Sequence, residues 1–144
     1  MALFRKTKQE LEQALEKLEA AEKRIRDMEA DMQALETSMP LLVMSRDGLI
    51  ERASEPFLEL LGYSRENLIG QHHRVLCKSD YVQSEDYIVF WRDLAIGHAK
   101  QGYFATLFAD GSELELHARY LPVLSEKNVV IRVVVLISPD EFSE

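Results

Sequence analysis

Cysteine is nearly absent from this chain of 144 residues, with a single copy at Cys77, so an internal disulfide is excluded. Basic residues are also outnumbered, because 17 lysines and arginines stand against 25 acidic residues and leave a net charge of −8. Binding to a nucleic-acid backbone depends on clustered basic side chains. Nucleic acid is therefore not an expected partner.

Long apolar runs are missing as well. The longest, from Val133 to Ile137, has the length of a strand, far below the roughly 18 residues that span a bilayer. The first ten residues, MALFRKTKQE, carry positive charge with no apolar stretch behind them, unlike a secretory signal. We expect a cytoplasmic protein with no membrane span.

Catalytic motifs are absent too. The sequence contains no Gly-rich phosphate loop, no HExxH and no GxSxG. We therefore do not expect an enzyme. Because 47% of the residues are hydrophobic, the chain can still build one domain core, with room for an appendage.

A seven-residue repeat runs through residues 1–38. One row of mostly apolar residues recurs at every seventh position, and a second row lies three positions later. The two rows are Phe4, Leu11, Leu18, Ile25, Met32 and Thr7, Ala14, Ala21, Met28, Leu35. Good helix formers separate them, and neither Gly nor Pro occurs before Pro40. The pattern predicts one coiled-coil helix over about residues 3 to 37.

Such a helix would be roughly 50 Å long, more than a domain of this size can cover, so we expect it to pair with a second copy. The charges flanking the repeat favour a parallel homodimer, because two cross-chain pairs attract and one repels; these are Lys17–Glu22, Arg24–Glu29 and Asp31–Glu36. The expected dimer interface contains Phe4, Leu11, Leu18, Ile25, Met28, Met32 and Leu35. A solitary amphipathic helix that caps the domain is the alternative.

Residues 39–140 have a different pattern, with strands predicted over 41–45, 49–53, 102–110, 112–124 and 129–138. Between the second and third strands, serine caps and glycine stops predict helices over 55–61, 64–70 and 84–97. In the last helix the expected apolar face contains Tyr87, Ile88, Trp91, Leu94 and Ala95. In the strand over 112–124 alternation puts Leu114, Leu116, Ala118 and Tyr120 on one face. The order predicts an α+β domain with an antiparallel sheet and short helices on one side.

This order, together with the stretch FLELLGYSRENLIGQHHRVLC and the residues Tyr81, Ser84, Tyr87, Phe90, Trp91, Leu94 and Gly97, resembles the Per-Arnt-Sim (PAS) sensor domain of bacterial chemotaxis and aerotaxis receptors. The resemblance covers about residues 39–140 and implies a five-stranded sheet whose helices enclose a pocket. Residues 141–144 would then be a tail or the start of an output linker.

The segment GQHHRVLCKSDY, residues 70–81, would border that pocket. In light-oxygen-voltage relatives, the position of His73 holds the cysteine that bonds flavin, and Cys77 lies four residues further on, so adduct photochemistry is not expected. The resemblance implies an FAD site formed from His72, His73, Asp80, Trp91 and Ser54. It also implies a haem site with His73 or His72 as the iron ligand. We prefer a pocket without cofactor, in which one histidine is buried and Cys77 is a small core residue.

The sequence therefore predicts a cytoplasmic sensory and dimerisation module of a chemotaxis-type signalling protein. It would sense redox state, oxygen or a small ligand and relay the signal through helices of a dimer to a downstream domain or protein. A cofactor-free protein-interaction module is the alternative.

Overall fold

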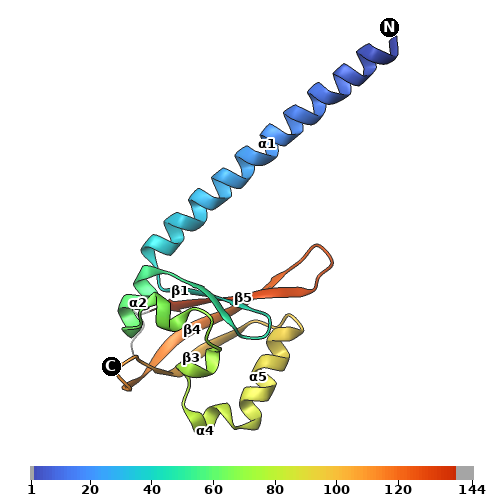
Figure 1. Ribbon diagram of the computed structural model, residues 1–144. Coiled ribbons are helices and arrows are strands. Elements are labelled where there is room, and N and C mark those ends of the chain that lie inside the picture. Colours follow the sequence, from blue (N-terminus) through green and yellow to red (C-terminus); the bar gives the residue numbers. More distant parts are fainter. Residues whose placement is uncertain (1, 139–144) are drawn as a thin grey trace. The chain divides into compact units, whose positions relative to one another are not determined.

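The computed structural model of the chain describes residues 2–138 (Figure 1). In chain order its elements are α1 (Ala2–Ser38), β1 (Leu41–Ser45), β2 (Ile50–Ala53), α2 (Glu55–Leu61), α3 (Arg65–Leu68), the 3-10 helix η1 (His73–Leu76), α4 (Ser79–Val82), α5 (Glu85–Ala95), β3 (Lys100–Leu107), β4 (Glu113–Leu124) and β5 (Val130–Ser138). The chain divides after Leu35 into two compact units. The expected tail over 141–144 lies outside the described residues.

The described part of the first unit lies within α1, which is continuous for 37 residues and buries none of its side chains. An ion pair between Lys23 and Asp27, at 2.8 Å, joins neighbouring turns of its surface. The apolar heptad residues are exposed along its length, among them Leu18 and Ile25. Among the described residues, no helix combines the length and the apolar character needed to cross a membrane. The helix is confirmed, and the coiled coil and its dimer stay predictions.

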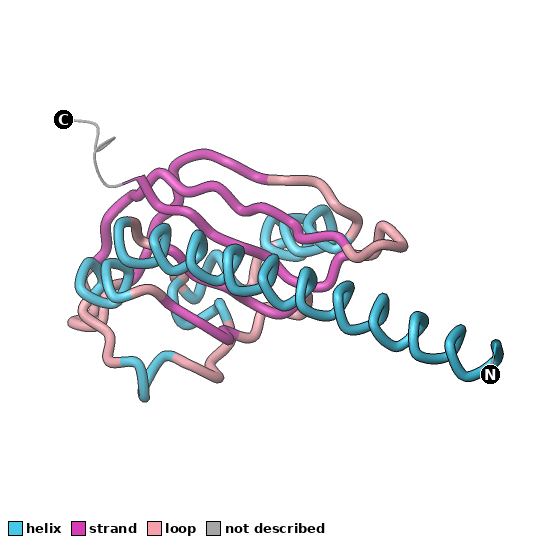
Figure 2. Tube along the Cα trace, turned by 90° about the horizontal axis from the view of Figure 1, so that it is seen from above, coloured by secondary structure: helices cyan, strands magenta, loops and turns pink. Residues whose placement is uncertain are grey.

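The second unit is built on a five-stranded sheet with the order β2-β1-β5-β4-β3, in which every neighbouring pair is antiparallel. The last strand therefore lies between the first strand and β4, and in Figure 2 the strands run side by side. Tight turns join the hairpins. Gly48, in the turn between β1 and β2, has a φ of 88°, and a Cβ there would lie 2.7 Å from the His72 ring. The predicted α+β fold with a five-stranded antiparallel sheet is confirmed.

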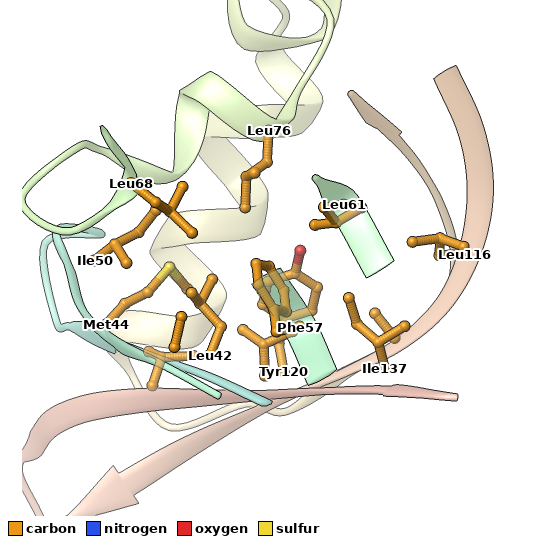
Figure 3. Close-up of a cluster of buried hydrophobic side chains, with 14 of the residues drawn as sticks. Leu42, Met44, Ile50, Phe57, Leu61, Leu68, Leu76, Leu116, Tyr120 and Ile137 are labelled. Carbon is orange, nitrogen blue, oxygen red and sulfur yellow. The ribbon is translucent and has the colours of Figure 1, made fainter. Parts of the chain in front are cut away.

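The hydrophobic core lies between one face of this sheet and the short helices. Figure 3 shows side chains from both layers pointing into a common interior, among them Leu42, Phe57, Leu68 and Leu116. Helix α2 contributes Phe57 because Ser54 caps its first turn and Gly62, with a φ of 82°, ends it. The serine and glycine signals in the sequence thus placed this helix correctly.

The predicted apolar face of α5 is partly wrong. Tyr87, Phe90 and Leu94 are the buried residues, whereas Ile88 is 65% exposed. The buried set follows the spacing of one helix stripe, and Ile88 is rotated about 100° from Tyr87, toward solvent. The helix also ends at Ala95, two residues before the glycine expected to stop it.

The alternation predicted for β4 is confirmed, because Leu116, Ala118 and Tyr120 are buried on one face, and only the first residue of that face is exposed. Leu114 is 45% exposed because it lies at the start of β4, opposite Thr106 near the hairpin turn, whereas Leu116 is fully buried. Between α3 and α5 the structure adds η1 and α4, each of four residues. Elements this short have too few residues to produce a visible periodicity in the sequence.

Candidate functional site

A cavity of about 630 Å³ lies in the second unit, between the inner face of the sheet and the helical segment that precedes and begins α5. Its volume is in the range of pockets for small organic ligands. The lining residues are Leu42, Phe57, His73, Leu76, Cys77, Lys78, Asp80, Tyr81, Ser84, Asp86, Phe90, Tyr103, Phe104, Ala105, Thr106, Ala118, Tyr120, Val135 and Ile137. Most of them are apolar or aromatic, and the polar groups are few.

Backbone pairing holds the segment after Gly70 against the start of β2. The amide of Gly70 donates to the carbonyl of Ile50, and the amide of Ile50 donates to the carbonyl of Gln71, both at 2.8 Å. The His73 amide then donates to the carbonyl of Gly48, also at 2.8 Å. These bonds fix the backbone on either side of His72, so the side chains of His72 and His73 point in different directions.

The histidines have separate roles. His72 Nδ1 accepts a hydrogen bond from the Arg74 amide at 3.0 Å, so His72 caps η1. His73 points inward and is only 2% exposed. Its Nδ1 lies 3.0 Å from the Tyr87 hydroxyl and its Nε2 lies 2.9 Å from the Tyr120 hydroxyl. Both ring nitrogens of His73 therefore have hydrogen-bond partners.

His73 is neutral in this setting. Burial, with a smaller effect from the neighbouring His72, lowers its pKa from 6.5 to about 3. A neutral imidazole has one donor and one acceptor nitrogen, so one tyrosine donates to the ring and the other accepts from it. When Tyr87 donates to Nδ1, the ring donates from Nε2 to the Tyr120 oxygen. The Tyr120 hydroxyl is then available to donate a hydrogen bond to a ligand. The Tyr87–His73–Tyr120 triad can thus present either a donor or an acceptor through Tyr120.

Cys77 lies beside this triad. Its Sγ is 3.6 Å from His73 Nδ1 and 3.7 Å from the His73 carbonyl oxygen. Burial raises the pKa of the thiol to about 12, although an interaction with Tyr87 works in the opposite direction. A protonated, buried thiol is a poor nucleophile. Cys77 therefore behaves as a core residue.

Three aromatic rings form one wall of the cavity. Phe90 and Tyr120 meet edge to face with ring centroids 4.8 Å apart, and Phe104 lies 5.2 Å from Tyr120 and 5.7 Å from Phe90. The sequence had placed Tyr120 on an inward face. The apolar face predicted for α5 left out Phe90, which was named only for its resemblance to PAS domains, and no role was predicted for Phe104.

Charged groups line the cavity where α4 and the first turn of α5 face the sheet. The Lys78 ammonium lies 3.3 Å from a carboxylate oxygen of Glu113 at the start of β4. Asp80 and Asp86 also line the cavity, and neither has a basic partner within ion-pairing distance among the described residues. No motif in the sequence indicated that Lys78 and Glu113, 35 positions apart, would pair.

The five residues expected to bind a cofactor do not all meet at the cavity. His73 and Asp80 are on its lining, whereas His72, Trp91 and Ser54 are not. Trp91 packs against both histidines, with ring centroids 5.5 Å from His73 and 5.9 Å from His72. Ser54 is buried at the start of α2, where it accepts from the Leu41 amide at 2.9 Å and donates to the Met39 carbonyl at 2.8 Å.

The lining does not fit haem or a phosphorylated flavin. Iron ligation by His73 would break a hydrogen bond to Tyr120 or Tyr87, and His72 lies outside the cavity. Lys78, the one cationic residue of the described lining, is already paired, so phosphates or propionates would meet no free positive charge.

Comparison with known proteins gives one family. A model of the PAS domain matches residues 38–140. The biofilm dispersion protein BdlA of Pseudomonas aeruginosa is 41% identical over 103 residues, which are 72% of this chain and 25% of that protein. The chain therefore matches about a quarter of the length of this curated relative.

Solved structures show the same fold at lower identity. The LOV protein of Rhodobacter sphaeroides superposes with a TM-score of 0.64 at 16% identity, covering 74% of this chain and 62% of that chain. A PAS domain from Colwellia psychrerythraea gives a TM-score of 0.61 at 20% identity, covering 69% and 84%. These structures show the fold, and the family rests on the PAS domain model and the curated relative.

Proposed function

Because the chain belongs to the PAS domain family, we propose that it is a cytoplasmic sensory and dimerisation module of a bacterial signal-transduction system of the chemotaxis type. A small ligand in the cavity would be the signal. The chain would relay it through helices of a parallel dimer and would not catalyse a reaction. The similarity to a biofilm dispersion protein supports a role in signalling.

The observation that carries this proposal is the cavity itself. A domain of this size normally packs its core without large voids, so a space of about 630 Å³ lined by aromatic rings and a few polar groups is suited to a ligand. The Tyr87–His73–Tyr120 triad supports the proposal, because its hydrogen bonds can reverse direction to match a donor or an acceptor on the ligand.

The sheet offers a route from the cavity to the N-terminal helix. Val135 and Ile137 line the cavity from β5, and β5 pairs directly with β1, where Val135 lies opposite Leu42. The Ile137 amide donates to the carbonyl of Pro40 at 3.1 Å, in the two-residue link between α1 and β1. A ligand that shifts β5 would therefore shift the residues that follow α1.

Ser54 couples the same link to the helical layer. Its hydroxyl bonds Met39 and Leu41 on either side of Pro40, and it also accepts from the Phe57 amide at 3.3 Å as the cap of α2. Phe57 in turn lines the cavity. In place of the cofactor contact expected from the sequence, Ser54 is proposed to fix the junction through which the signal passes.

The dimer half of the proposal rests on the exposed heptad residues of α1. A stripe of leucine, isoleucine and methionine along a helix is stabilised when a second copy covers it. The cross-chain pairs Lys17–Glu22 and Arg24–Glu29 support a parallel arrangement. Since the curated relative is about four times longer than the matched region, we propose that the output lies in a further domain or a separate protein.

Ligand binding in the cavity can be tested with a cavity-filling variant. We would record the absorption spectrum of the purified full chain and then screen small metabolites and cofactors by their effect on thermal unfolding. Ala118→Phe fills the cavity from the centre of β4, and Arg119→Phe is the matched control on the opposite face of that strand. We expect compounds that stabilise the wild type and Arg119→Phe but fail to stabilise Ala118→Phe.

The opposite result is equally informative. If no compound stabilises the wild type, or if stabilisation is the same in Ala118→Phe, the ligand-sensing proposal is wrong and the protein-interaction module replaces it. Should Ala118→Phe fail to fold, Ala118→Leu removes less of the cavity and gives the same comparison. A Soret band near 400 nm or a flavin band near 450 nm would contradict our assignment of a cofactor-free cavity.

A further inference from the structure

We infer that the cavity selects an organic cation, in which an ammonium group is attached to an aromatic or aliphatic body. This inference rests on the proposed function, because it names the class of ligand for the same cavity. It follows from the carboxylates and the aromatic rings that line the same cavity.

The free charge on the lining is negative. Lys78, the only basic side chain of the described lining, lies 3.3 Å from Glu113 and is neutralised by it. The carboxylates of Asp80 and Asp86 have no basic partner within ion-pairing distance among the described residues. His73 is held neutral between two tyrosines and adds no positive charge. A ligand in the cavity therefore meets two uncompensated carboxylates.

The two carboxylates come from separate elements that line the same cavity, and both residues are exposed. Asp80 lies in α4 and Asp86 in the first turn of α5, with the Ser84 cap between them. Each is an acidic residue in the first turn of its helix, a position that also stabilises the helix, and one oxygen of Asp80 accepts from the Tyr81 amide at 2.8 Å. Both residues also line the cavity, so their negative charge faces a ligand held there.

The aromatic residues complete the match. Tyr81, Phe90, Tyr103, Phe104 and Tyr120 line the same cavity, and the faces of such rings carry negative potential that attracts ammonium groups. The apolar body of the ligand would be buried against Phe57 and Ile137. A cavity lined by aromatic rings and carboxylates favours a cation, accepts a neutral molecule less well and disfavours an anion.

Three compounds with one indole body test this order at pH 7. Tryptamine is cationic, tryptophol is neutral and indole-3-acetate is anionic. With the full chain in isothermal titration calorimetry, we expect tryptamine to bind most tightly and indole-3-acetate least. The double variant Asp80→Asn and Asp86→Asn should weaken tryptamine binding about five- to tenfold and leave tryptophol unchanged, as expected for the loss of partly exposed charges.

Two further variants sharpen the test. Glu113→Gln leaves the positive charge of Lys78 without its partner. This variant should therefore bind tryptamine more weakly and indole-3-acetate more tightly than the wild type. Glu126→Gln removes an acidic residue from the turn between β4 and β5, outside the lining, and should leave the affinity for both compounds unchanged. Because all of these positions are exposed in the structure, the variants should fold.

The ligand class is overturned if tryptophol or indole-3-acetate binds the wild type as tightly as tryptamine, or if the Asp80→Asn and Asp86→Asn variant keeps its affinity for tryptamine. It is also overturned if none of the three compounds binds. The proposed function fails separately, when the cavity-filling comparison of Ala118→Phe and Arg119→Phe shows no ligand of any class.

Discussion

The ring of His73 and the hydroxyl of Tyr120 meet at 2.9 Å, although 47 residues separate them in the chain. One comes from η1 and the other from β4, so this contact joins the helical layer to the sheet beside the cavity. On the other side of the ring, Tyr87 of α5 makes the second hydrogen bond, at 3.0 Å. His73 thus ties three elements together, which has consequences for stability.

Tyr120→Phe should lower the free energy of unfolding by about 1 to 3 kcal/mol, because it leaves a buried ring nitrogen of His73 without its partner. Urea denaturation followed by circular dichroism would measure the change. Tyr81→Phe is a suitable control, since the structure gives the Tyr81 hydroxyl no hydrogen bond among the described residues. Equal stability of the two variants would contradict a structural role for the triad.

Stability should also fall in mild acid because of His73. Its pKa is about 3 in the folded chain and 6.5 in the unfolded chain, so below pH 6.5 the unfolded state binds a proton that the folded state does not. The stabilisation is complete above pH 6.5 and is lost as the pH falls toward 3. At pH 4.5 the loss from this group amounts to about 2 to 3 kcal/mol.

Denaturation of the wild type and of His73→Gln at several pH values would isolate this effect, because glutamine does not titrate. The pH dependence between 6.5 and 4 should be shallower in His73→Gln. Tyr120→Phe retains the buried imidazole and should keep the steep dependence. Parallel curves for the wild type and His73→Gln would show that His73 is not buried as a neutral ring.

Cys77 should react slowly with thiol reagents at pH 8. Its pKa is raised to about 12, so only a small fraction of the thiol is ionised, and the side chain is buried. We expect little release of colour from Ellman's reagent in the native protein and full reaction in urea. Rapid labelling of the native protein would mean that the segment after Gly70 opens readily.

The dimer prediction can be tested on α1. Leu18→Glu with Ile25→Glu places charge on the heptad stripe and should give monomers in sedimentation at tens of micromolar. Ala20→Glu with Ala30→Glu adds the same charge on other faces of the helix and should leave the dimer intact. A monomeric wild type, or equal dissociation of both variants, would exclude a dimer through this stripe.

Ser54→Ala removes the hydroxyl that caps α2 and bonds both sides of Pro40. We expect a loss of about 1 to 3 kcal/mol in unfolding free energy, since a buried amide and a carbonyl lose their partner. Ser64→Ala removes an exposed cap from α3 and is a control for capping alone. A loss no larger than that of Ser64→Ala would show that the link between α1 and β1 does not depend on Ser54.

Local signals in the sequence predicted the fold well. The α2 helix is enclosed by a serine cap and a glycine in the left-handed conformation, and the β3–β4 hairpin turns at Asp110 and Gly111. These devices act within a few residues, so they can be recognised without the tertiary structure. The heptad of α1 is also a local repeat, and it predicted a helix whose observed ends differ by one residue from those expected.

The site was less accessible to prediction, because its residues come from distant segments. The sequence identified His73 and Asp80, but His72, Trp91 and Ser54 proved to lie off the cavity. Which of two adjacent histidines faces inward depends on the backbone bonds from Gly48 and Ile50, which belong to another part of the chain. Phe90 was left off the predicted apolar face of α5 because that face was drawn through Ile88, whose side chain is exposed.

By itself, the sequence determined the long N-terminal helix, the order of the elements and the antiparallel α+β fold, because caps, turns and periodicity are properties of neighbouring residues. Only the tertiary structure decided which histidine is buried and neutral, and it alone showed the pairing of Lys78 with Glu113 that leaves Asp80 and Asp86 without a basic partner. Burial and charge pairing depend on which distant segments pack together. They also set the chemistry of the cavity.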